Sequence, residues 1–96
     1  MANQFGDKLK KLREGQKLLQ RQLASLLDMD TPLLSKIERG ERIAKKETVS
    51  KLSEIFRADK DELLTLWLAD QVYDVIKNED HADEALKSVS KKIKNK

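Results

Sequence analysis

Cationic side chains are the groups with the clearest chemical potential in the first half of this sequence. Residues 1–48 hold 11 Lys and Arg against 7 Asp and Glu, a net charge of +4. Ammonium and guanidinium groups bind polyanions such as a phosphate backbone. Residues 49–86 carry a net charge of −6, and residues 87–96 carry +5 from lysines alone. We therefore expect the N-terminal half to face a polyanion, while the lysine tail is either a solvated charge run or a non-specific contact with nucleic acid.

Side chains suited to catalysis or metal binding are scarce. The 96 residues include no cysteine and one histidine, His81, which excludes a disulfide framework, a thiol nucleophile and a cysteine-based zinc site. His81 cannot form a metal cluster alone and is expected to be an exposed polar residue. No Ser/His/Asp arrangement, glycine-rich phosphate loop or evident carboxylate pair is present. The sequence therefore favours a protein that is not an enzyme and that holds no metal or cofactor.

The N-terminal residues lack the apolar core of a signal peptide, and no segment approaches the roughly 18 apolar residues that a membrane span requires. We therefore expect a cytoplasmic protein without membrane contact. Charged residues make up 39% of the chain and aromatic residues only 4%, which suits charged helices over an aliphatic core.

Apolar residues recur with helical spacing along the chain. Phe5 and Leu9 fall four residues apart, and Val49, Leu52 and Ile55 follow at intervals of three, so each set is expected on one buried helix face. The same reasoning predicts helices over about 4–14, 20–27, 31–39, 45–56, 60–76 and from 82 into the lysine-rich end. No segment alternates with a period of two, so no sheet is expected.

Several residues mark the helix boundaries. Gly15 is expected to close the first helix as a C-terminal cap. Asp28 tolerates a left-handed turn conformation, and Asp30 can cap the helix that follows it. Asp59 begins a capping box. The second predicted helix has Leu19 where a Ser or Thr cap is expected, so its start has no visible signal.

The segment from Gln20 to Gly40 places two short helices on either side of Asp28-Met29-Asp30. It contains Leu23-Ala24 and ends in Ser35-Lys36-Ile37-Glu38-Arg39-Gly40. These features resemble the helix-turn-helix of the phage-repressor-like, or xenobiotic-response-element (XRE), family of bacterial regulators, and the resemblance covers about residues 4–66. It implies an all-α fold, with a compact five-helix lambda-repressor-like DNA-binding domain over residues 1–66 and a C-terminal helical extension over residues 67–96.

The resemblance implies double-stranded DNA as the partner, with the helix from Thr31 in a major groove about 12 Å wide. It places base contacts at Thr31, Pro32, Leu33 and Lys36. Lys36 can donate to guanine, while Thr31 and Leu33 offer methyl groups to thymine. Pro32 and Leu33 depart from the polar residues more usual in the family, so hydrogen-bond readout should be poorer. Leu33 is alternatively a core residue.

A second group of residues is expected to hold the DNA backbone. Gln20 resembles the family's phosphate-binding glutamine, and basic residues surround the same groove. Any one of them alone reads as a solvated charge, but together they suit phosphate clamping, which positions a protein without reading sequence. The predicted phosphate contacts are Gln20, Arg21, Ser35, Arg39, Arg42, Lys45 and Lys46.

Arg13 and Glu38 match a family pair that joins the first and third helices. The resemblance implies a structural ion pair that orients the reading helix. The alternative is two separate exposed charges.

The C-terminal third lies outside the resemblance. From Leu63 to Ile76 the apolar residues cover more than one helical stripe, so a second surface must cover part of this helix. We expect the segment from Leu63 to Ile76, together with the last helix, to form a homodimer interface, with Leu66, Trp67, Val72 and Tyr73 as anchors. The extension over residues 67–96 is thus the expected dimerisation region. The alternative is that the last helix folds back over these side chains within one chain.

These observations favour a transcriptional regulator that binds a palindromic operator as a homodimer. Repression follows if the operator overlaps a promoter, and activation would need contact with RNA polymerase. The alternative is an antitoxin that neutralises a partner toxin through the C-terminal third and regulates its own operon.

Overall fold

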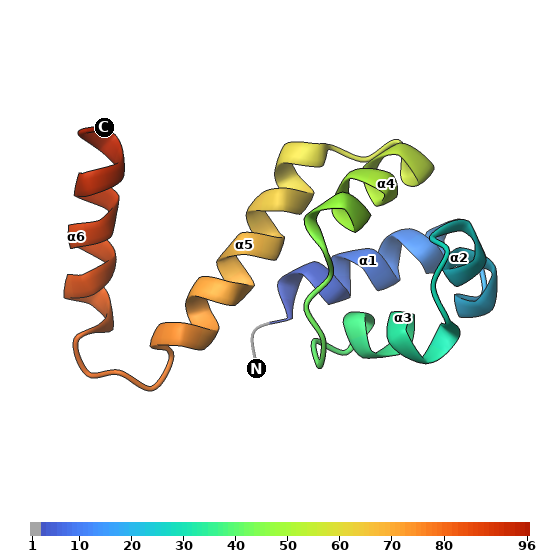
Figure 1. The fold of residues 1–96 in the computed structure, drawn as a ribbon, viewed down its shortest axis with the longest axis horizontal. Helices are drawn as coiled ribbons and strands as arrows, with labels where there is room; N and C mark the ends of the chain where they lie inside the picture. The colour runs from blue at the N-terminus through green and yellow to red at the C-terminus, as the bar shows by residue number, and fades with distance from the viewer. Residues whose placement is uncertain (1–2) are drawn as a thin grey trace.

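The computed structural model describes residues 3–96, and every regular element in that range is a helix (Figure 1). The expected all-α fold is confirmed, and most of the predicted helices lie within about one residue of those observed. The helices are α1 (Gln4–Gly15), α2 (Gln20–Leu26), α3 (Thr31–Glu38), α4 (Lys46–Phe56), α5 (Lys60–Ile76) and α6 (Ala82–Lys94).

Side-chain caps begin two of these helices as the sequence predicts. The Asp30 carboxylate accepts a hydrogen bond of 2.8 Å from the Leu33 amide at the start of α3. At the start of α5, the Asp59 carboxylate accepts from the amides of Asp61 and Glu62, which is one half of the predicted capping box. The Glu62 carboxylate lies 3.3 Å from the Lys8 ammonium group instead of closing the other half. Asp28 adopts the predicted left-handed conformation, with φ of 54°. Because these interactions are local, the turn between α2 and α3 and the start of α5 can be predicted from the sequence.

The expected cap at Gly15 is wrong. Gly15 is the last residue of α1, and the left-handed residue is Lys17, with φ of 56°. The Leu18 amide donates to the Arg13 carbonyl, and the Lys17 amide donates to the Glu14 carbonyl. This is a Schellman turn, which brings the residue after the left-handed position back against the helix. Because that residue is the apolar Leu18, which packs on the core, the turn forms two residues later than predicted.

The start of α2 is closed without Ser or Thr. The Gln22 side-chain oxygen accepts a hydrogen bond of 2.7 Å from the Leu19 amide. This is the reciprocal half of a capping box, made from inside the helix. The residue that caps the start of α2 is therefore Gln22, three residues after Leu19.

One apolar core brings together the helices from α1 to α5. In α4 the buried face consists of Val49, Leu52 and Phe56, while Ile55 is only half-buried. The prediction that Ile55 is a core residue is therefore wrong, because the helical period of 3.6 residues carries Phe56 onto the face and Ile55 to its edge. The buried apolar residues are Phe5, Leu9, Leu23, Ala24, Leu27, Leu34, Ile37, Ala44, Val49, Leu52, Phe56 and Leu63.

The N-terminus of α1 packs closely on the C-terminus of α3 through a glycine. A Cβ atom at Gly6 would lie 2.5 Å from the Glu38 carbonyl oxygen and 2.8 Å from the Ile37 carbonyl oxygen. The Asn3 side chain donates to the Glu38 carbonyl at 2.8 Å. Gly40, with φ of 77°, ends this segment in a conformation that favours glycine. These contacts fix the end of α3 against α1.

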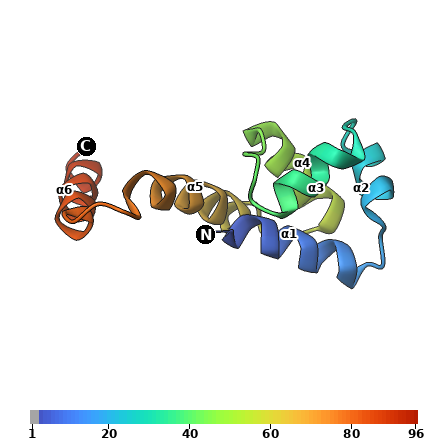
Figure 2. The same ribbon diagram turned by 90° about the horizontal axis from the view of Figure 1, so that it is seen from below.

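Helix α5 connects two regions of different character. The helical body comprises residues 3–71, and the C-terminal arm comprises residues 72–96. Figures 1 and 2 show α5 leaving the body and α6 standing apart at the far end. The radius of gyration is 15.1 Å, against about 13 Å for a compact chain of this size. The arm therefore extends away from the body.

Two side chains of α5 beyond residue 66 bind the body. The Trp67 indole nitrogen donates to the Ala44 carbonyl at 2.8 Å. The Asp70 carboxylate accepts from the Gln4 and Phe5 amides at 3.1 and 2.9 Å, which caps α1. The expected boundary between residues 66 and 67 therefore lies inside a continuous helix. Among the described residues, no helix has both the length and the apolar character of a bilayer span.

Candidate nucleic-acid interface

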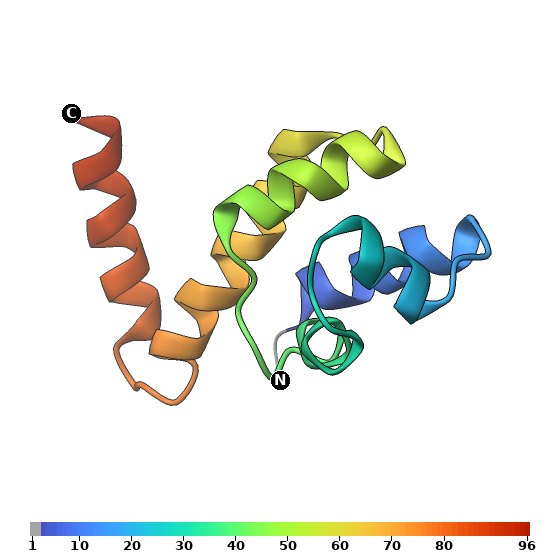
Figure 3. The ribbon, with the colours of Figure 1, turned by 45° about the vertical axis from the view of Figure 1, so that its right-hand side comes forward.

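Helices α2 and α3 form a packed pair at the surface of the body. Leu23 and Ala24 from α2 and Leu34 and Ile37 from α3 are buried. Figure 3 views α3 nearly end-on at the edge of the body. Pro32 occupies the first turn of α3, where its missing N–H is not needed. One face of α3 is thus held by the core, and the opposite face is free to meet a partner.

The residues expected to contact bases lie on or beside that free face. Pro32 and Lys36 are exposed, and Thr31 is half-buried. Leu33 is also half-buried and packs against the core. It therefore lies between the two alternatives of an exposed contact residue and a core residue. Lys36 is the one member of this group with a charged hydrogen-bond donor.

The expected phosphate contacts come from α2, from the C-terminal end of α3 and the loop after it, and from α4. Arg21 is exposed on α2, and Arg42 and Lys45 are exposed on the segment that joins α3 to α4. Lys46, also exposed, begins α4. Exposed cations therefore lie on the elements that precede and follow α3 along the chain. Exposed cations on these elements suit contact with the phosphate backbone of DNA.

Arg39 and Ser35 interact with each other at the C-terminal end of α3. The Arg39 guanidinium donates to the Ser35 hydroxyl and to the Glu41 carboxylate. The hydrogen bond from Arg39 holds the pKa of Glu41 below its usual range, and the same bond raises the pKa of Arg39. Arg39 is therefore an oriented cation whose charge Glu41 partly offsets.

The structure brings Arg13 and Glu38 together as a buried ion pair. Nε and Nη2 of Arg13 donate to the two carboxylate oxygens of Glu38 at 2.7 and 3.1 Å, and both residues are more than 90% buried. These hydrogen bonds raise the pKa of Arg13 above its ordinary value. Nη1 of Arg13 also donates to the Leu18 carbonyl. The pair ties α1 to the last turn of α3.

Gln20 joins the same network. Its side-chain nitrogen donates to the Glu38 carboxylate at 3.0 Å. A primary amide has two N–H groups, so one remains for the phosphate contact that the sequence suggests. The sequence gives no signal for the bond between Gln20 and Glu38, because the two residues are 18 positions apart.

A hollow of about 510 Å³ lies between α3 and α4, on the side of Arg42. Leu33 and Ile43 contribute apolar surface to it, and Lys45 and Lys51 contribute charge. Ile43 is 63% exposed. Sequence reasoning missed Ile43 and Lys51 as candidates for the interface, because only the folded position of α4 brings Lys51 beside the loop. Among the described residues, no group of three or more acidic or His side chains is arranged to hold a metal ion.

The four expected dimer anchors divide between the two regions. Leu66 and Trp67 are half-buried and pack against the core of their own chain. Val72 and Tyr73 are 40% and 47% exposed. In the described structure α6 does not cover these two side chains, so the alternative of a last helix folded back over them is not the arrangement observed.

A family model described as helix-turn-helix matches residues 9–63, which is more than half of the chain. No curated protein and no solved structure matches the chain. The matched segment begins in α1, includes the whole of α2, α3 and α4, and ends at the buried Leu63 of α5. The chain belongs to the XRE-type helix-turn-helix family and is a DNA-binding transcriptional regulator.

Proposed function

We propose that this regulator binds a palindromic operator in the cytoplasm as a homodimer, with α3 of each chain in the major groove. The observation that carries the proposal is the two-sided character of α3. Leu34 and Ile37 hold one face in the core, while Lys36 and Pro32 are exposed on the other. A helix held in this way can enter a groove without leaving its own core.

Each part of the surface has a separate task in this proposal. Lys36 donates to O6 or N7 of a guanine, while Pro32 and Thr31 make apolar contact with a thymine methyl group. Arg21, Arg42 and the lysines at the start of α4 bind phosphates and set the register of α3 without reading sequence. The readout thus depends on few hydrogen bonds, and a bias toward thymine next to a guanine is expected.

Two-fold pairing follows from the size of the module. A single small DNA-binding module buries roughly 600–1,000 Å² of protein surface, which limits its affinity. A dimer doubles that interface and matches two half-sites about 34 Å apart. The interface between copies is proposed to lie in the C-terminal arm, with Val72 and Tyr73 in it and with Leu66 and Trp67 at its border with the body.

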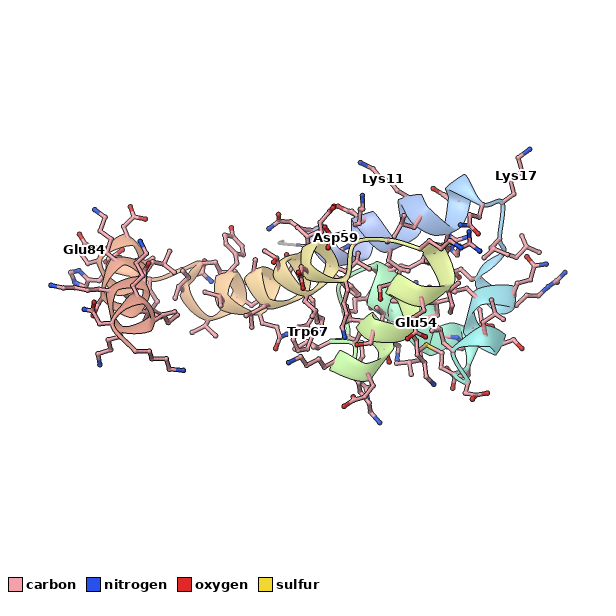
Figure 4. All side chains as sticks on the ribbon, turned by 90° about the horizontal axis from the view of Figure 1, so that it is seen from above. Lys11, Lys17, Glu54, Asp59, Trp67 and Glu84 are labelled. Carbon is pink, nitrogen blue, oxygen red and sulfur yellow. The ribbon has the colours of Figure 1, made fainter. Side chains whose placement is uncertain are left out.

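The proposal is tested by selecting bound sites from random duplex DNA and then comparing two variants. We expect the selected sites to be palindromic. Lys36→Ala should relax base preference at one position of each half-site. Arg42→Ala should weaken binding to all sequences and lower the salt dependence of binding by about one ion. Lys11→Ala is the control, since Lys11 projects from the outer edge of α1 (Figure 4) and should bind as the wild type does.

If Lys36→Ala and Arg42→Ala both keep wild-type affinity and preference, α3 is not the reading element. An independent check is NMR titration with the selected duplex, in which the amides of residues 31–36 should shift. Selected sites without two-fold symmetry would contradict the dimer while leaving the contact by α3 intact.

A second candidate function is that of an antitoxin, which neutralises a partner toxin and regulates its own operon. The observation that favours it is the exposed apolar surface of the arm, including Val75 at 76% and Ile93 at 62% exposure. Such a surface suits a protein partner. Stable one-to-one capture of a small toxin by a chain that does not self-associate would establish this function instead.

A further inference from the structure

Helix α6 is amphipathic but has no covered face in the described structure. None of its residues, Ala82–Lys94, is buried. Leu86, Val89 and Ile93 are 41%, 53% and 62% exposed, and Figure 4 shows the side chains of α6 pointing into open space. Isolated helices shorter than about 12–15 residues are marginal in water. A 13-residue helix therefore needs a partner surface to be stable.

The spacing of the apolar residues defines the kind of surface that fits. Ala82, Leu86, Val89 and Ile93 follow one another at intervals of four, three and four residues. This is the seam of a two-helix coiled coil, in which such residues interlock with the same pattern on a second helix. The seam matches one opposing helix better than a broad flat surface.

The apolar surface continues from α6 onto α5. Leu86 lines a shallow groove of about 500 Å³ together with Leu68, Val72, Tyr73 and Ile76 of α5. In Figure 1 the two helices form an open V that is joined by the loop after Ile76. A helix that pairs with the seam of α6 would therefore also reach the side chains of α5.

The charges on α6 select the direction of the partner helix. Its first turn carries Asp83 and Glu84, and its last turn carries three lysines, Lys91, Lys92 and Lys94. Two parallel copies would place like charges side by side. Two antiparallel copies place the acidic end of each helix beside the basic end of the other, which is the favourable arrangement.

We propose that α6 pairs antiparallel with α6 of a second copy of this chain, about a two-fold axis between Leu86 and Val89. Asp83 and Lys94 lie about three turns apart and hence on the same flank of the seam. The two-fold axis brings Asp83 of one chain to within about 3 Å, along the helix axis, of the level of Lys94 of the other. The partner's α6 then covers the seam and the neighbouring groove on α5. The proposal rests on the proposed dimeric function and names the surface that forms the dimer.

The same charges also stabilise a single helix, since acidic residues suit its N-terminus and basic residues its C-terminus. That effect needs no partner, so the test must separate pairing from helix stability. Val89→Glu places a carboxylate in the seam. Ser88→Glu adds the same charge to the neighbouring position, which lies away from the seam, and serves as the matched control.

The first experiment measures the mass of the full chain by sedimentation. We expect a dimer for the wild type and for Ser88→Glu. Val89→Glu should weaken dimerisation by about tenfold or more, because an unpaired buried charge is costly. Circular dichroism of the three chains shows whether the body stays folded. Because α6 is marginal without a partner, only a small loss of helix content is expected for Val89→Glu and none for Ser88→Glu. A dimer that Val89→Glu leaves intact, or a wild-type monomer that captures another protein through the arm, overturns the proposal.

The second experiment fixes the direction. Because the chain has no cysteine, single substitutions give unambiguous crosslinks. A mixture of Ala82→Cys and Ile93→Cys chains should form disulfide-linked heterodimers under mild oxidation, while Ala82→Cys alone should crosslink poorly. Efficient crosslinking of Ala82→Cys with itself would show a parallel pair and overturn the proposal. Footprinting of the Val89→Glu variant on a single half-site distinguishes failure of the α6 pairing from failure of DNA binding by α3. Contact by α3 does not depend on how the arm pairs.

Discussion

The helical body and the C-terminal arm both carry apolar residues at helical spacing, but only the body buries these side chains within its own chain. Every buried apolar side chain in the described chain lies in the body, and the last of them is Leu63. In the arm, over residues 72–96, only Ile76 and Ala82 are even half-buried. The arm still carries Leu86, Val89 and Ile93 at helical spacing. Amphipathic spacing therefore predicts that a helix forms, but it does not say whether the covering surface belongs to the same chain.

The strongest test of this contrast is the removal of a buried charge from the body. Glu38→Ala leaves the Arg13 guanidinium buried without its carboxylate partner, and Gln20 also loses an acceptor. The free energy of unfolding should fall by about 3–5 kcal/mol, as measured by urea denaturation. The matched change in the arm is Asp74→Ala, which breaks an exposed pair with Lys77 and should cost less than about 1 kcal/mol. Equal losses of unfolding free energy in the two variants would contradict the difference between the buried body and the exposed arm.

The close approach of α1 and α3 gives the next largest effect. Gly6→Ala places a methyl group less than 3 Å from two backbone carbonyl oxygens of α3, so one of the two helices must shift. We expect a loss of about 1–3 kcal/mol in unfolding free energy. Gly15→Ala is the control, because nothing lies within 4 Å of a Cβ atom at that position. Thermal unfolding of the two variants compares them directly. A Gly6 variant as stable as the Gly15 variant would show that the helices can separate at little cost.

A smaller effect is expected where α5 binds the body. Asp70→Ala removes the carboxylate that caps α1 through the Gln4 and Phe5 amides. Loss of a helix cap costs about 0.5–2 kcal/mol, and hydrogen exchange at the first amides of α1 should rise. Asp80→Ala, in the loop before α6, is the control. Unchanged exchange in the Asp70 variant would show that this end of α5 is not part of the body.

The smallest effect on folding is expected in the arm itself. Val75→Ser replaces a side chain that is 76% exposed. The stability of the body should change by no more than about 0.5 kcal/mol. The same substitution should alter self-association only if Val75 lies in the interface, so unfolding and sedimentation are measured on the same sample. A large loss of stability in a monomeric sample would show that the arm packs on its own body.

The parts of the fold that could be predicted are those with short-range signals. Asp28, Asp30 and Asp59 act on residues within a few positions. Asp28 takes the predicted turn conformation, and Asp30 and Asp59 cap the helices that they were expected to begin. The cap at Gly15 was mispredicted because the contact of Leu18 with the core, and not the glycine, decides where the turn forms. Asp70 was missed entirely because its partners lie 65 and 66 positions away, and no pattern in one sequence connects them.

In the candidate site, too, some features could be predicted from the sequence and others could not. The family pattern gave the positions of α3 and the pairing of Arg13 with Glu38. It could not indicate that Leu33 turns partly toward the core, that Arg39 is held by Ser35 and Glu41, or that Lys51 lies beside the loop after α3. The burial of Leu33 depends on its contact with the core, and the place of Lys51 depends on where α4 lies relative to the loop after α3. Periodicity alone fixes neither of them.

The continuity of α5 has a consequence for operator length. One end of this helix is anchored in the body by Leu63, Trp67 and Asp70, and its other end leads to the proposed contact between copies. In the proposed dimer only the last five residues of α5, residues 72–76, lie between the body and α6. They rise about 7.5 Å at 1.5 Å per residue, so the length of this segment sets the distance between the two copies of α3. Inserting one helical turn after Gln71 should shift the preferred spacer between half-sites rather than change the bases that are read.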